Sequence, residues 1–448
     1  MASKVMMTEG PIGRAMLSFS IPLIFSNLLQ VLFNMSDLAV VGNFAGPEAL
    51  GAVGSTTMIV CLYTFFIIGL ASGINALMAR FIGAGRQTDV TDTLHTGFLL
   101  MILMGLTMMV LGLVTSGPLL RLLSTREDLY DQALLYLRLY ALGYPAMAVY
   151  NHGHAVYSAM GNTRKPLIYL ALAGLLNVAL NLFFVIVCRM DVAGVAVASA
   201  LSQCLAAALM LISLKKEKGD FHLSFTRVRL IRAKASAILK LGLPAGFQNS
   251  IFMIANMFVQ SAVNSFPTVI VMGNSAASNA DNLNYEVISA FYVAGTSFIG
   301  QNYGAGKKDR ILKSYFWSLG LATAVSCFIC LMLGLFGHQF LSLFTSDREV
   351  IEAGMLKLGI MVFSYPLACF MDATTSASRG LGRTFVPTFI LILGSCIFRI
   401  IWVYAIFQLF GTIPALYLLY MFSWIISSVA EILYFVHIYR TDPILKKA

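Results

Sequence analysis

The sequence predicts an all-α integral membrane protein built from two related halves. Three observations support this fold class. Of the 448 residues, 58% are hydrophobic and only 11% are charged, the apolar runs are long and continuous, and the second half repeats the first. So few charged residues cannot cover a water-soluble body of this size. Runs of about 20 apolar residues match helices that cross the bilayer core, and they lack the alternation of barrel strands.

Apolar stretches of this length occur at twelve places. The first half has them at 15–41, 52–80, 93–115, 133–158, 166–187 and 192–214. The second half has them at 238–264, 270–301, 314–336, 354–378, 387–409 and 414–438. We therefore expect twelve transmembrane helices in two bundles of six, with an N-lobe at residues 1–214, a basic cytoplasmic linker at 215–236 and a C-lobe at 237–448.

Short motifs of the first half recur in the second at a nearly constant offset. Tyr144-Pro145 recurs as Tyr365-Pro366, and the segment 82–86 recurs as 303–307. Because each half has an even number of predicted helices, both halves enter the membrane in the same sense, so the repeat is parallel. Matched repeats are typical of secondary transporters, in which a site between two bundles opens to either side in turn.

The positions of Lys and Arg predict the orientation in the membrane. With both termini inside, 23 of the 30 basic residues lie on the cytoplasmic side, from Lys4 through eight residues between Lys215 and Lys240 to the C-terminus. Cytoplasmic loops carry such an excess. The net charge of +10 then belongs to the face that meets anionic lipid, and it gives no support for nucleic-acid binding.

Four polar residues lie within the predicted N-lobe helices, where an ionisable group costs roughly 2.5–3.5 kcal/mol and normally faces a cavity or a partner. They are Asp37, Asn177, Asn181 and Ser199. Asn177 and Asn181 share one helix face, and all four are expected in the outer half of the lobe. A carboxylate among neutral oxygens can take up a proton or a hard cation. Alternatively, the three neutral side chains only hydrogen-bond neighbouring helices.

The predicted C-lobe helices carry different ionisable residues. Glu286, Asp372 and Arg399 lie inside the stretches, and Glu431 lies in the last one. Because an arginine at this depth requires an anionic partner, we expect Arg399 to pair with Glu286 or Asp372 as a structural or gating ion pair. The alternative is a second protonation site.

No set of residues indicates a catalytic nucleophile, a metal centre or a phosphate loop. The glycine turns at 83–85 and 304–306 lack the Lys-Ser/Thr that follows in phosphate loops. We therefore expect no enzyme activity, no metal and no cofactor apart from a coupling ion, H⁺ or Na⁺.

Several segments together resemble the bacterial multidrug and toxic compound extrusion (MATE) transporters. They are QNYGAGKKDR at 301–310, NVALN at 177–181, GVAVASALSQ at 194–203 and SRGLGRTFVP at 378–387, with Pro22 and Asp37 in the first stretch. The sequence departs from some branches, which have an aspartate where Asn181 stands, and from others, which place an acidic residue where Phe252 stands.

The resemblance implies two six-helix bundles around a V-shaped cleft, in a monomer of the bacterial inner membrane with cytoplasmic termini. It implies export of amphipathic, mostly cationic organic compounds in exchange for H⁺ or Na⁺, with a coupling site at Asp37, Asn177, Asn181 and Ser199. Small organic substrates and membrane lipid are then the partners. The alternative is a flippase for lipid-linked oligosaccharides from the related superfamily. Such a protein should carry several cationic residues in its cleft, whereas only Arg399 is evident from the sequence.

Overall fold

The computed structural model describes residues 7–447, and in this range the regular structure is entirely helical. Lys4, counted above among the inner basic residues, lies outside the described residues. The first helices are α1 (Ile12–Phe44), α2 (Pro47–Gly83), α3 (Gln87–Leu122), α4 (Glu127–Ala141), α5 (Tyr144–Met160), α6 (Arg164–Leu182), the π-helix η1 (Phe183–Val187) and α7 (Asp191–Lys216). Two 3₁₀ turns follow, η2 (Gly219–Phe221) and η3 (Phe225–Arg227).

The second half begins with α8 (Arg232–Val263), which corresponds to α1. It continues with α9 (Thr268–Gly304), α10 (Lys308–Ser342), α11 (Arg348–Gly380), α12 (Phe385–Leu391), η4 (Ile392–Ile397), α13 (Phe398–Ile401), η5 (Trp402–Ile406), α14 (Phe407–Phe410), α15 (Ile413–Thr441) and α16 (Pro443–Lys447). The segment from α12 to α14 is one expected span in which α and π turns alternate.

Helices occur at all twelve expected positions. Within the described residues, ten helical segments are long and apolar enough to cross a membrane by length and composition. The expected span 133–158 is divided between α4 and α5, neither of which reaches the required length alone. The expected span 270–301 lies within the 37 residues of α9, which contain many Asn and Ser side chains as well as Asp281 and Glu286.

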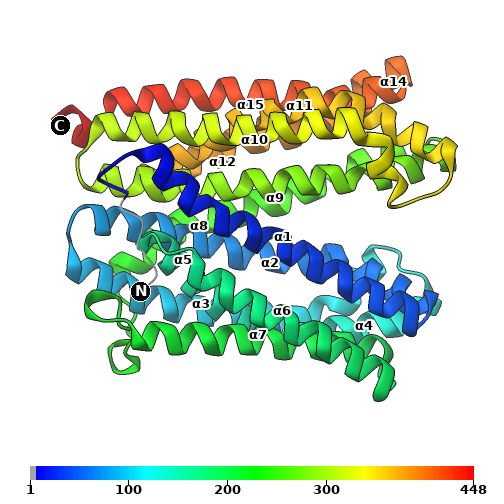
Figure 1. Ribbon diagram of the computed structural model, residues 1–448, viewed down its shortest axis with the longest axis horizontal. Helices are drawn as coiled ribbons and strands as arrows, with labels where there is room; N and C mark the ends of the chain where they lie inside the picture. Colours follow the sequence, from blue (N-terminus) through cyan, green and yellow to red (C-terminus); the bar gives the residue numbers. More distant parts are fainter. Residues whose placement is uncertain (1–6, 448) are drawn as a thin grey trace. The chain divides into compact units, whose positions relative to one another are not determined.

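The chain forms two compact units. Unit 1 is Phe25–Phe247, and unit 2 comprises residues 7–24 and 248–447. The unit boundaries therefore fall within α1 and α8, shortly after Pro22 and Pro244. Each proline removes one intrahelical hydrogen bond at this place. In unit 2, α9 packs against α10 and α11, and α11 also packs against α15 (Figure 1).

Glycines allow helices to approach closely in unit 1. A Cβ atom on Gly69 of α2 would lie 2.4 Å from the backbone nitrogen of Gly246 in α8. A Cβ atom on Gly73 would lie 2.6 Å from the nitrogen of Gly242. Small residues at helix contacts are typical of membrane proteins, because close backbone packing replaces the hydrophobic driving force.

The segment before α1 is bound to unit 2. Arg310 donates hydrogen bonds to the carbonyl oxygens of Met7, Glu9 and Gly10 over 3.0–3.2 Å, and Asn302 Nδ2 donates to Met7 over 3.1 Å. Further along α1, the rings of Phe19 and Phe298 meet edge to face with centroids 5.7 Å apart. The first part of α1 is thus an integral part of unit 2.

Candidate functional site

The structure brings the four predicted polar residues of unit 1 together. Asn181 Nδ2 donates to Asp37 Oδ1 over 2.5 Å, and Ser199 Oγ donates to Asp37 Oδ2 over 3.2 Å. Asn177 joins both donors, because it accepts from Asn181 Nδ2 at 3.2 Å and donates to Ser199 Oγ at 3.3 Å. Residues from α1, α6 and α7 therefore form one connected cluster around a single carboxylate.

A close helix contact places Asp37 beside α6. A Cβ atom on Gly174 would lie 1.8 Å from the ring of Phe33, so glycine is required for this ring to pack there. Phe33 and Asp37 are four residues apart on α1 and share a face, as do Asn177 and Asn181 on α6. The contact between Phe33 and Gly174 therefore directs Asp37 toward the amides.

Asn177, Asn181 and Ser199 are buried and Asp37 is half-buried, and one acceptor of the cluster has no hydrogen-bond partner among the described residues. Asn181 has no exposed surface, and its Oδ1 atom has no hydrogen-bond partner among the residues that the structure describes. A buried acceptor without a partner is costly. The Oδ1 atom of Asn181 can accept a hydrogen bond from a protonated Asp37 or serve as one oxygen ligand of a bound cation. Tyr136 and Tyr140 lie within electrostatic reach of Asp37.

The ion pair expected for Arg399 is not the arrangement found in unit 2. Arg399 Nη1 donates to Asn256 Oδ1 over 2.9 Å, and its Nε donates to Ser423 Oγ over 3.3 Å. The described ion pairs include none between Arg399 and Glu286 or Asp372. In place of the expected carboxylate, Arg399 has neutral acceptors and the ring faces of Phe252, Tyr420 and Trp424. The nearest ring is that of Tyr420, whose centroid lies 4.6 Å from the guanidinium carbon. A buried guanidinium can be accommodated by aromatic faces as well as by an anion.

A different arginine lies near the inner carboxylates. Arg379 is 6% exposed, donates to Gln248 Oε1 over 2.7 Å and lies over the ring of Tyr292. It is within electrostatic reach of Asp372 and Glu431. Glu431 is completely buried, and neither carboxylate oxygen has a hydrogen-bond partner among the described residues.

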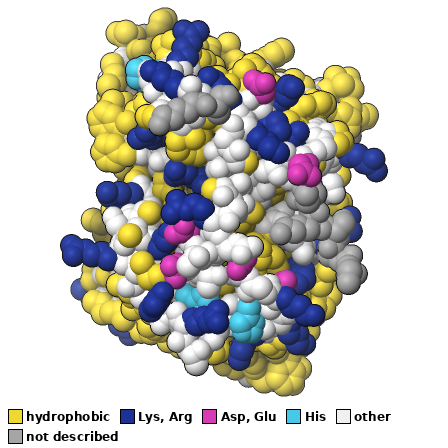
Figure 2. Space-filling model, turned by 90° about the vertical axis from the view of Figure 1, so that its left-hand side faces the viewer, with side chains coloured by type: hydrophobic (Ala, Val, Ile, Leu, Met, Phe, Trp, Pro, Cys, Tyr) yellow, Lys and Arg dark blue, Asp and Glu magenta, His cyan; other side chains and the backbone are white. Residues whose placement is uncertain are grey.

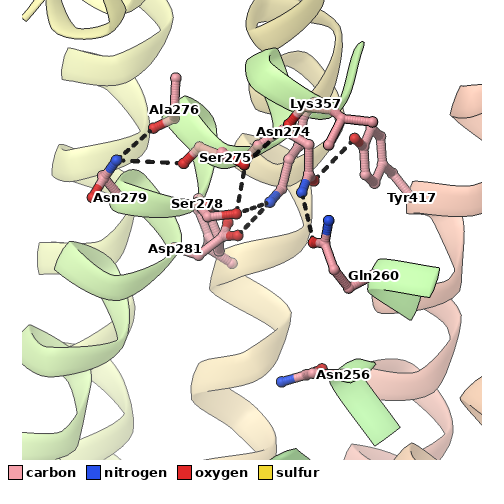
Figure 3. A network of polar contacts seen from close by, with 12 residues as sticks. Asn256, Gln260, Asn274, Ser275, Ala276, Ser278, Asn279, Asp281, Lys357 and Tyr417 are labelled. Carbon is pink, nitrogen blue, oxygen red and sulfur yellow. Dashed lines mark hydrogen bonds and ion pairs between the residues drawn. The ribbon is translucent and has the colours of Figure 1, made fainter. Parts of the chain in front are cut away.

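Sequence reasoning missed a polar network of unit 2 that is centred on Lys357 and Asp281 (Figure 3). Lys357 Nζ lies 2.7 Å from Asp281 Oδ2 and donates to Ser278 Oγ over 2.8 Å. Tyr365 donates a hydrogen bond to Asp281 Oδ1. Lys357 is 3% exposed. Unit 2 therefore buries three basic side chains, those of Lys357, Arg379 and Arg399.

Helix periodicity and a glycine contact build this network. Asn274, Ser278 and Asp281 are spaced i, i+4 and i+7 and therefore share one face of α9. A Cβ atom on Gly273 would lie 2.7 Å from the backbone nitrogen of Gly354, so α9 and α11 approach closely next to Lys357. The polar spacing in 270–301 and the charged residue in 354–378 were the signals that could have revealed the network.

The network continues to α15 and α8. Tyr417 donates to Asn274 Oδ1 over 3.1 Å, and Asn274 Nδ2 donates to Gln260 Oε1 over 3.0 Å (Figure 3). Gln260 donates to Asn264, which lies one turn further along α8. Asn256, Gln260 and Asn264 are exposed and spaced four residues apart. A row of exposed amides on a membrane helix must face water or protein, since lipid cannot satisfy them.

Repeated halves of membrane helices, each with a polar cluster inside, define the class of polytopic membrane transporters. The MatE family profile matches residues 22–183 and 244–405, once in each half of the chain. The chain therefore belongs to the MatE family, the multidrug and toxic compound extrusion transporters.

Curated relatives agree with this assignment. The chain is 30% identical over 360 residues to the probable multidrug resistance protein YpnP of Bacillus subtilis, which covers 80% of either chain. It is 27% identical to the probable multidrug resistance protein NorM of Thermotoga maritima, covering 85% of this chain and 82% of the relative. It is 24% identical to a FAD transporter of Shewanella oneidensis, covering 77% of each.

Solved structures show the same fold. A MOP superfamily transporter from Pyrococcus furiosus, described as having a binding pocket of reverse polarity, superimposes with a TM-score of 0.92 at 21% identity. The match covers 100% of this chain and 99% of that one. A MATE transporter in complex with MaL6 also gives 0.92 at 21% identity and covers both chains completely. The all-helical fold with two repeats is therefore confirmed.

Proposed function

We propose that the protein is a secondary antiporter that exports amphipathic organic compounds by alternating access, in exchange for H⁺ or Na⁺ that moves inward. The observation that carries this proposal is the half-buried carboxylate of Asp37 with the buried side chains of Asn177, Asn181 and Ser199 around it. One elementary charge that crosses 100 mV releases roughly 2.3 kcal/mol, which can drive a substantial substrate gradient. Family membership points to transport rather than catalysis.

Asp37 is the coupling residue in this proposal. When ionised, it accepts from Asn181 and Ser199, and with a proton or a cation bound it has the free Oδ1 atom of Asn181 as an additional oxygen partner. The cluster therefore supplies two alternative hydrogen-bond arrangements around one carboxyl group. Binding and release of the ion can shift the equilibrium between two conformations only through such a difference.

The proposed location is the bacterial inner membrane with both termini in the cytoplasm. Lys and Arg side chains gather on the end of the molecule shown in Figure 2. In the sequence, the turns after α2 and α9 both carry basic residues, among them Arg86, Lys307 and Lys308. An excess of basic residues marks the cytoplasmic side.

Everted membrane vesicles provide the test. Vesicles that contain the protein receive either a pH gradient with the acidic side in the lumen or a sodium load in the lumen. Uptake of a fluorescent amphipathic dye is measured under each gradient. Uptake above that of vesicles without the protein is expected with one gradient, which also identifies the ion. If neither gradient drives uptake of any dye in a chemically varied panel, the antiport proposal is wrong.

The second candidate, a flippase for lipid-linked oligosaccharides, gains one specific observation. Unit 2 buries three basic side chains, those of Lys357, Arg379 and Arg399, where the sequence had indicated only Arg399. A pyrophosphate linkage would require several such cations. However, Lys357 already has Asp281 as its partner. Reconstituted liposomes with a labelled lipid-linked oligosaccharide distinguish the candidates, since only a flippase makes the label accessible from the opposite leaflet.

A further inference from the structure

We propose that Arg399 and Lys357 form a recognition site in unit 2 for the acidic group of an aromatic organic compound. The inference rests on the proposed export function and specifies the chemistry of its substrate. It departs from the expectation of cationic substrates. The first observation is that, of these two buried basic side chains, Lys357 is paired with the carboxylate of Asp281, whereas the described hydrogen bonds of Arg399 go to neutral acceptors.

Arg399 makes its described hydrogen bonds to neutral groups and to no anion. Its two described hydrogen bonds go to the neutral acceptors Asn256 Oδ1 and Ser423 Oγ, although the side chain is only 2% exposed. A guanidinium has five N–H donors in a fixed fork that matches a carboxylate or phosphate. Nη2 makes no hydrogen bond within residues 7–447. An acidic ligand would therefore add the anion that Arg399 lacks.

Lys357 is linked to Arg399 through shared neighbours. Tyr420 lies under the guanidinium of Arg399 and within electrostatic reach of Lys357. Asp281, the partner of Lys357, is likewise within electrostatic reach of Arg399. Arg399 and Lys357 therefore both exert their positive charge on the region around Tyr420 and Asp281. Asp281 supplies the negative charge in this region.

Aromatic rings surround these charges. Trp424 has ring contacts with Tyr420 at 5.7 Å and Tyr365 at 6.4 Å, and Arg399 lies over its face. The exposed amide of Asn256, which binds Arg399 directly, gives the region a polar edge on α8 (Figure 3). Aromatic faces with cations beside them suit a flat ring that carries a negative charge, because the ring stacks while the acid reaches the cations.

Asp281 acts as an internal competitor in this site. Its carboxylate holds Lys357 when the site is empty, with Tyr365 as a further donor. An arriving acidic group competes with Asp281 for Lys357, so removal of the Asp281 charge should strengthen binding. A purely structural ion pair predicts no gain in binding, because removal of the Asp281 charge then only leaves a buried lysine without a partner.

Equilibrium binding without any ion gradient tests the proposal on the purified full-length protein. The probes are carboxyfluorescein, which is anionic, and rhodamine 123, which has a similar ring system and a positive charge. The readout is fluorescence anisotropy. The variants are Arg399→Gln and Asp281→Asn, and the matched control is Lys313→Gln, which removes one positive charge from an exposed position of α10.

Arg399→Gln should weaken carboxyfluorescein binding at least about tenfold, because a charge-assisted hydrogen bond is lost. Asp281→Asn should strengthen it, and Lys313→Gln should leave it unchanged. Rhodamine 123 binding should not weaken in Arg399→Gln. Benzoate and phenyl phosphate as competitors show whether carboxylates, phosphates or both are accepted, and benzyltrimethylammonium should not compete.

The proposal is overturned if the wild-type protein does not bind carboxyfluorescein, if Arg399→Gln and Lys313→Gln bind it equally well, or if Arg399→Gln weakens both dyes alike. Weaker carboxyfluorescein binding in Asp281→Asn would also contradict it. The antiport proposal is tested separately by gradients in vesicles. Gradient-driven uptake of rhodamine 123 without carboxyfluorescein binding would refute only the acidic-group site.

Discussion

Lys357 Nζ lies 2.7 Å from Asp281 Oδ2, and the two residues connect α11 to α9 in the interior of unit 2. Lys357 is 3% exposed and Asp281 is 27% exposed, so removal of either partner leaves the other charge largely shielded from water and without compensation. Lys357→Met alone should cost about 3–5 kcal/mol of stability. Lys357→Met with Asp281→Leu should recover most of it. Thermal unfolding in detergent of the wild type, both single variants and the double variant gives the coupling energy; additive effects would show that the pair is not coupled.

Arg399→Ala should be destabilised by a different mechanism than the sequence suggested. It loses hydrogen bonds to Asn256 and Ser423 and the contact with Tyr420. Because Arg399 is not paired with Glu286 or Asp372, adding Glu286→Gln or Asp372→Asn should not restore stability. Melting temperatures of the single and double variants check this. Recovery with either second substitution would show that an ion pair forms in the membrane after all.

Asp37→Asn should abolish ion-driven export while the protein remains folded. Asparagine keeps the shape of the side chain and accepts hydrogen bonds with its remaining oxygen, but it carries no charge and takes up no proton. Transport in everted vesicles should fall to the level without the protein, with the melting temperature nearly unchanged. Asp131→Asn, at an exposed position of α4, is the control. Export by Asp37→Asn at the wild-type rate would remove Asp37 from the coupling mechanism.

Gly273→Ala should destabilise unit 2 although alanine favours helices. The added Cβ would lie 2.7 Å from the backbone nitrogen of Gly354, a contact that only a shift of α9 or α11 can relieve. Overpacking of this kind costs about 1–3 kcal/mol. Gly320→Ala in α10 is the matched control, since its Cβ would meet nothing within 4 Å. Unfolding temperatures should fall for the first variant and not for the second.

Arg310→Gln should release the segment that precedes α1. The variant loses the hydrogen bonds to the carbonyl oxygens of Met7, Glu9 and Gly10. Amide hydrogen exchange of residues 7–16 should become faster, because a locally less stable segment opens more often. Lys313→Gln in the same helix serves as the control. Unchanged exchange would mean that Asn302 and the contacts of α1 hold the segment without Arg310.

Features that depend on a single helix or on the repeat could be predicted from the sequence. Contacts that depend on how different helices pack against one another could not. The twelve helical positions follow from the length of the apolar runs, and the shared face of Asn177 and Asn181 follows from helix periodicity. The approach of Asp37 to Asn181 additionally depends on Phe33 fitting against Gly174. The described hydrogen bonds of Arg399 go to residues other than the expected carboxylates, because depth in the membrane alone does not reveal which helix faces meet. Lys357 was missed although it lies in an expected span, since its burial depends on the contact between Gly273 and Gly354.

The division of α1 between the two units has a consequence for biosynthesis. Residues 12–24 belong to unit 2, where Phe19 meets Phe298 and Gly13 lies against Trp317. The ribosome makes this segment before its partners, which follow only after residues 25–247. At about 5–20 residues per second, that interval is on the order of 10–40 s. During this time residues 12–24 lack their native neighbours in unit 2, so an insertion factor or lipid must accommodate them until the second half is made.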